Sequence, residues 1–195
     1  MARAADQVIV HARRCGDVGA EIRASFTYAN AALEGPTPVR EALERCAALL
    51  VAVETDRVAR AHIALFMAQL RAMAGDASGA AALADEARRA LEEVRGMTAA
   101  STSPQTSRIA RLAGDLEAAE RLLRADSEAL AALGDAYLRL TIDGLLAGVL
   151  VDRGAIEEAE AVACGVRDEA GEDDADAQAL WRAALAGVRS RRGAH

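Results

Sequence analysis

The residues best suited to bind a metal ion are His11 and Cys15, which lie four positions apart in a helical pattern. Residues at this spacing share one face of an α-helix, so an imidazole and a thiolate could serve as two ligands of a zinc ion. A zinc site needs at least three protein ligands, and no further candidate lies near in the sequence. His62 and His195 are isolated. We therefore expect no metal site and no cofactor.

Other residue types that carry chemistry also lack the necessary pattern. The acidic run from Glu172 to Asp176 has neither the alternating oxygen ligands nor the central glycine of a calcium loop, so we expect it to cap the following helix. Four serines occur without the His and Asp arrangement that activates a nucleophile, namely Ser25, Ser101, Ser103 and Ser107. The sequence predicts a protein that is not an enzyme.

The charge pattern argues against nucleic acid as a direct ligand. The formal net charge is −7, and all 23 basic residues are Arg, interleaved with Asp and Glu. Neutralising phosphates would require a basic face, which this pattern does not supply. We expect no direct binding of nucleic acid.

The apolar segments and the cysteines predict a cytoplasmic protein. The N-terminal segment has no signal-peptide core, and the strongest apolar run, Leu145 to Val151, is too short to cross a bilayer. The three cysteines are widely spaced and odd in number, which is typical of free thiols in a reducing compartment. We therefore expect no membrane association.

The composition predicts an all-α fold. Alanine, the strongest helix former, is by far the commonest residue, whereas a β-branched run occurs only at Val8 to Val10. Aromatic residues make up 3% of the chain, so the core must be built from small side chains.

Glycines recur about 40 residues apart, which indicates a helical repeat. Each is flanked by apolar-periodic segments, so each predicts the bend of a helical hairpin at which φ is positive. An Asp that often follows is expected to cap the next helix. The five turn glycines are Gly35, Gly75, Gly114, Gly154 and Gly193. Small residues after the turns should allow close helix packing, at Ala42, Ala80, Ala119 and Ala159.

The repeat predicts one domain, 1–195, folded as an α-solenoid of antiparallel hairpins. A closed helical bundle is the alternative, but it does not require regular spacing of the turns. We expect a first helix at 3–15, hairpins at 17–54, 56–95, 98–133 and 136–170, and an unpaired last helix at 174–192. Pro104 predicts a kink or a late start in the helix at 98–113. The alternative is that Ser103 caps a helix with Pro104 at its first position.

Three segments resemble a known group of repeats: Gly35 to Cys46, Ala99 to Arg124 and Asp174 to Gly193. They are similar to the tetratricopeptide-like C-terminal arrays of large actinobacterial signalling proteins, which combine an adenylate/guanylate cyclase or LuxR-type module with a P-loop ATPase. The resemblance implies a regulatory or protein-interaction segment, because the catalytic parts of those proteins lie elsewhere. Such arrays continue into a further helix beyond the position of Gly193, so the resemblance also implies an excised piece or a shortened relative.

In a solenoid the first helices of successive hairpins line the inner wall, so equal offsets from the turn glycines form columns. Small residues in these columns, such as Gly148 and Gly187, should leave room for a guest chain. Arg108 and Arg111 could clamp a carboxylate through paired donors. The candidate binding residues of this wall are His62, Gln69, Arg108, Arg111 and Thr141.

We therefore expect a scaffold that binds a peptide, a helix or a sister domain on its concave wall. An alternative is a sensor domain whose groove takes a small effector and controls an attached ATPase, cyclase or DNA-binding module. A third possibility is self-association through the two terminal helices, whose apolar faces would otherwise be exposed.

Overall fold

A computed structural model describes residues 1–93 and 102–193. The chain divides into two compact units, Met1–Arg95 and Gly96–His195, which are described separately. All ten regular elements in the described residues are α-helices, and these residues contain no strand. The all-α prediction is confirmed.

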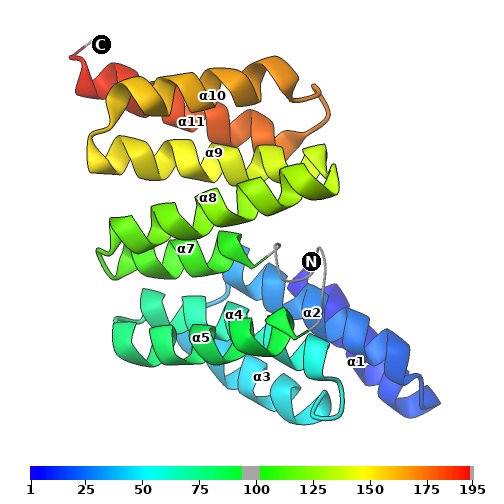
Figure 1. Ribbon diagram of the computed structural model, residues 1–195. Helices are drawn as coiled ribbons and strands as arrows, with labels where there is room; N and C mark the ends of the chain where they lie inside the picture. Colours follow the sequence, from blue (N-terminus) through cyan, green and yellow to red (C-terminus); the bar gives the residue numbers. More distant parts are fainter. Residues whose placement is uncertain (94–101, 194–195) are drawn as a thin grey trace. The chain divides into compact units, whose positions relative to one another are not determined.

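In the first unit, each helix packs on the next one in the sequence, and α2 also packs on α4 (Figure 1). Their shared core includes Ile9, Leu49 and Ile63, which are fully buried. The helices of this unit are α1 (Ala2–Cys15), α2 (Val18–Glu34), α3 (Val39–Ala52), α4 (Arg57–Met73) and α5 (Ala77–Glu92).

The second unit repeats this packing order, and α9 contacts both α7 and α11 in addition to its sequence neighbours (Figure 1). Its core is built around Leu123, Ile142 and Val149, all without exposed surface. The helices of this unit are α7 (Ser103–Leu112), α8 (Leu116–Leu133), α9 (Ala136–Arg153), α10 (Ile156–Glu169) and α11 (Ala175–Arg191).

Aspartates begin six of these helices, as the sequence predicts. In each case one carboxylate oxygen accepts a hydrogen bond from the backbone N–H three residues later, which satisfies a donor left open at the helix start. The capping residues are Asp17, Asp56, Asp76, Asp115, Asp135 and Asp174. The acidic run before α11 thus has the capping role expected of it.

Four of the five turn glycines have the predicted positive φ, and Gly35 does not. Gly75, Gly114, Gly154 and Gly193 have φ between 73° and 88°. Gly35 has φ −101° and ψ −172°, because Pro36 follows it and disfavours helical backbone angles in favour of an extended conformation. A Cβ at Gly35 would lie 2.5 Å from the carbonyl oxygen of Ala31, so this position needs glycine for space rather than for a positive φ.

In the second unit, α8 ends at Leu133 and α9 begins at Ala136, which are the end of the hairpin expected at 98–133 and the start of the hairpin expected at 136–170. The helix expected at 98–113 begins at Ser103, so the late start is confirmed. Thr102 rather than Ser103 is the N-cap, with Pro104 in the first turn. Residues 98–101 lie outside the described part of the chain. The four small residues after the turns, Ala42, Ala80, Ala119 and Ala159, are fully buried.

Candidate functional site

The predicted wall residues fall into two groups, one in each unit. His62 and Gln69 lie on α4 in the first unit, whereas Arg108 and Arg111 lie on α7 and Thr141 on α9 in the second. The first helices of neighbouring hairpins are in contact within each unit, α2 with α4 and α7 with α9. Each group therefore has its own local surface. Ser101 has the same offset from its turn glycine as His62 and Thr141, but it lies outside the described residues.

His62 belongs to an aromatic cluster that joins α2 and α4. Its Nδ1 lies 3.0 Å from the carbonyl oxygen of Val58, and its ring meets Phe26 edge-on at a centroid distance of 5.6 Å. Phe26 in turn meets Phe66 at 5.2 Å, also edge-on. Phe26 is 40% exposed, which makes it the most accessible part of this cluster and a place where an apolar side chain of a partner could pack.

Phe26 is not among the residues predicted from the sequence to line the wall. The signal was present, because Phe26 and Phe66 each lie nine positions before their turn glycines, Gly35 and Gly75. Gln69, which was identified, is only 7% exposed, and its Oε1 has no hydrogen-bond partner in the structure. The accessible chemistry of this first-unit surface is aromatic rather than amide-based.

Arg111 makes the main polar contact between α7 and α9. Its Nη2 donates to Oδ2 of Asp152 at 2.5 Å, and both side chains are 37% exposed. Gly148 on α9 leaves space beneath the guanidinium, since a Cβ there would lie 3.9 Å from Nη1 of Arg111. An ion pair this exposed contributes about 0–1 kcal/mol, so another carboxylate can compete with Asp152 for Arg111.

The other two second-unit residues are less open. Arg108 and Thr141 are both half-buried, and Arg108 already interacts with groups within the protein. Arg111 is therefore the most accessible of the predicted cationic groups on this surface.

A hollow of about 660 Å³ lies where the α7–α8 turn faces the end of α9. It is lined by the turn residues 113–117 and by Asp152 and Arg153. Because Asp152 is also the partner of Arg111, the exchangeable ion pair lies at the edge of this hollow. The lining carries the carboxylates of Asp115, Glu117 and Asp152, so Arg111, at the edge of the hollow, is the group that could hold an anion.

Gly144 and Gly187 lie at points where two helices pack closely. A Cβ at Gly144 would lie 2.7 Å from Cβ of Leu180, and a Cβ at Gly187 would lie 2.9 Å from Cγ1 of Val151. Both contacts join α9 to α11. The interpretation of Gly187 as room for a guest chain is therefore wrong, because Val151 already occupies that space.

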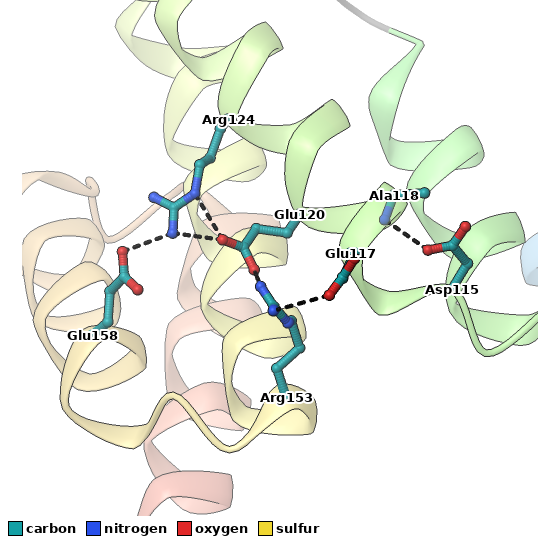
Figure 2. A network of polar contacts seen from close by, with 7 residues as sticks. All are labelled: Asp115, Glu117, Ala118, Glu120, Arg124, Arg153 and Glu158. Carbon is teal, nitrogen blue, oxygen red and sulfur yellow. Dashed lines mark hydrogen bonds and ion pairs between the residues drawn. The ribbon is translucent and has the colours of Figure 1, made fainter.

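An ion-pair network joins α8, α9 and α10 (Figure 2). Arg124 donates to Glu120 on its own helix and, at 2.7 Å, to Glu158 on α10. Arg153 on α9 donates to the other oxygen of Glu120 and forms a longer ion pair with Glu117 at 3.8 Å. The hydrogen bond from Arg153, helped by Arg124, holds the pKa of Glu120 below its ordinary value. Arg124 therefore links α8 to α10, and Arg153 links α9 to α8.

The potential metal ligands of the sequence remain an isolated pair. His11 and Cys15 line one hollow beside α1, and the described residues contain no group of three or more His, Cys, Asp or Glu placed to hold a metal ion. Cys46 is fully buried, and desolvation raises the pKa of its thiol to about 11. The thiol of Cys46 is thus a packing group, not a nucleophile.

Family models and curated sequences add nothing to the geometry of the site. No family model matches this chain, and no curated protein sequence matches it.

In residues 1–93 and 102–193, none of the helices has the length and apolar character that crossing a membrane requires.

Proposed function

We propose that this protein is a non-catalytic interaction scaffold, built as a tetratricopeptide-like α-solenoid, that binds a peptide, a helix or a sister domain on the wall formed by its first helices. The packing order supports the solenoid: within each unit, each helix contacts the next one in the sequence, and first helices contact first helices. A closed bundle would wrap its helices around one centre instead. By resemblance, we propose a regulatory segment of a bacterial signalling or transcription-regulatory protein.

The observation that carries the binding proposal is the exposed ion pair of Arg111 with Asp152. An acidic group of a partner takes the place of Asp152. A guanidinium donates to one carboxylate as readily as to another, and the exposed ion pair with Asp152 contributes little free energy. Asp152 then turns into the solvent-filled hollow that it lines. The acidic group is anchored without breaking any buried contact.

Charge variants of this pair make opposite predictions and so test the proposal. Asp152→Asn removes the competing carboxylate and should raise the affinity for acidic peptides, whereas Arg111→Ala should lower it by about tenfold. The probe is an array of peptides that carry Asp, Glu or a free C-terminus, beside amide counterparts of each. Arg189→Ala, at an exposed position on α11, is the matched control. Equal binding by all three variants would remove Arg111 as the anchor.

The hollow beside Asp152 supports one second candidate, a sensor for a small effector. A volume of about 660 Å³ is within the range of small-molecule sites. In that case a metabolite pool should raise the unfolding temperature, and Arg111→Ala should abolish the increase. Peptide binding without such stabilisation would favour the scaffold.

A further inference from the structure

The contact between α1 and α2 leaves a shallow apolar groove open to solvent. Two adjoining hollows, of about 590 and 370 Å³, share Ala4, Val8 and Ala20 as lining residues. Val8 is 47% exposed, although it borders the buried face of α1 that Ala5, Ile9 and Ala12 form. The groove is floored by small side chains, which permit close approach of another helix.

The rest of the molecule indicates what covers a groove of this kind. In the hairpin order, α1 is a second helix and α2 the first helix of the next hairpin. The pairs α3–α4, α8–α9 and α10–α11 have the same order, and each pair is covered by the preceding first helix. Thus α2 packs on both α3 and α4, α7 on both α8 and α9, and α9 on both α10 and α11. The occupant that fits the α1–α2 groove is a first helix.

Helix α11 is a first helix, and no residue in the described part of the chain covers its outer face. We define this face by Ala179, Ala183, Ala186 and Ser190, all exposed. The residues of α9 at the same distances from its turn glycine are Leu140, Gly144, Ala147 and Val151, all buried. Two of these four, Gly144 and Val151, touch α11 itself. The corresponding face of α9 packs against the next two helices, α10 and α11. The face of α11 is therefore suited to pack against a further pair of helices.

We propose that α11 of one copy of this protein covers the α1–α2 groove of a second copy. The α1–α2 pair of the second copy then follows α11 as α10–α11 follows α9 within the second unit, so the contact continues a packing already present in the chain. The two surfaces are different, so the association is head-to-tail rather than symmetric, and it can propagate to longer assemblies. This inference depends on the helix packing and not on the peptide site.

Substitutions on the two surfaces distinguish this arrangement from others. Val8→Glu places a charge in the groove, and Ala183→Glu with Ala186→Glu places two on the face of α11. All three positions are exposed, so each variant should keep the helicity of the parent protein by circular dichroism. Ala125→Glu with Ala161→Glu, at exposed positions of α8 and α10, is the matched control.

The measurement is the weight-average mass by sedimentation equilibrium over a range of protein concentrations. The unchanged protein and the control should exceed the monomer mass of 20.3 kDa increasingly as concentration rises, whereas both surface variants should stay monomeric. An equimolar mixture of the two surface variants should form a dimer that does not grow further, because each variant retains one intact surface.

Three results would overturn the proposal. If the unchanged protein is a monomer at every concentration, the two surfaces do not bind each other, and the groove belongs to a different partner. Self-association that survives in the α11 variant indicates a symmetric contact between two α1–α2 grooves. Failure of the mixed variants to form a dimer, while the unchanged protein associates, excludes a pairing of the groove with α11.

Discussion

The two units apply the same helix order with different side-chain chemistry. In the first unit, α2 and α4 meet through the aromatic cluster of Phe26, His62 and Phe66. In the second, α7 and α9 are linked by the ion pair of Arg111 with Asp152, and α9 and α11 by glycine contacts. The two units thus share the order in which helices meet, whereas the contacts differ: aromatic rings in one unit, and an ion pair with close glycine packing in the other.

The largest effect should come from truncating the separate cores. Ile63→Ala in the first unit and Ile142→Ala in the second each remove a fully buried side chain, which should cost about 2–5 kcal/mol in the free energy of unfolding. Hydrogen exchange read by mass spectrometry should show the larger loss of protection in the unit that carries the substitution. Equal loss in both units would contradict the assignment of a separate core to each.

Close packing of α9 on α11 should give the next largest effect. Gly144→Ala forces a Cβ against Leu180 and should destabilise the protein by about 1–3 kcal/mol in urea unfolding. Gly165→Ala on α10 is the control, because nothing lies near its added Cβ. The control should stabilise the protein by about 0.5–1 kcal/mol, since alanine is the better helix former. Similar effects at both positions would show that the glycine contact is not tight.

The aromatic cluster of the first unit should contribute less to stability than the close packing of α9 on α11. Phe26→Ala should cost about 0.5–1.5 kcal/mol in thermal unfolding, because the ring makes edge-on contacts but is partly exposed. Phe26→Leu keeps an apolar side chain and should recover part of that loss. No change on Phe26→Ala would mean that the cluster does not join α2 to α4.

The smallest effect should come from the ion-pair network, and it should depend on pH. The pKa of Glu120 is below its ordinary value of 4.5, so its contribution to stability is present above that value and is lost as the pH falls through the lowered pKa. Glu120→Gln should therefore destabilise the protein by about 1 kcal/mol or less at pH 7 and have no effect in strong acid. A loss of stability that is the same at every pH would contradict a role for the charge.

Local features of the fold were predictable from the sequence because they depend on neighbouring residues. The Asp caps and the positive φ at Gly75 or Gly114 follow from residues within one turn of the helix. Gly35 was predicted wrongly because its place in the repeat was given more weight than the proline beside it, which restricts the backbone more strongly. Local competition between two signals was thus the main source of error in the fold.

Features of the candidate site were less predictable because they depend on residues far apart in the chain. The partner of Arg111 lies 41 positions away, and the offsets identified Arg111 without indicating Asp152. Gly187 was interpreted as leaving space because its offset from the turn glycine does not show that Val151 on α9 lies against it. Phe26 could have been predicted, since it lies at the same offset from its turn glycine as Phe66. It was missed because only offsets with polar residues were considered as binding positions.

The most direct test of the account observes Arg111 itself. In a protein labelled with ¹⁵N-arginine, the guanidinium signal of Arg111, assigned by its absence in Arg111→Ala, reports which carboxylate it contacts. Titration with an acidic peptide should shift this signal, and Asp152→Asn should produce the shift at a lower peptide concentration. An Arg111 signal that stays unchanged when an acidic peptide binds would contradict the proposal that this ion pair is the anchor of the binding wall.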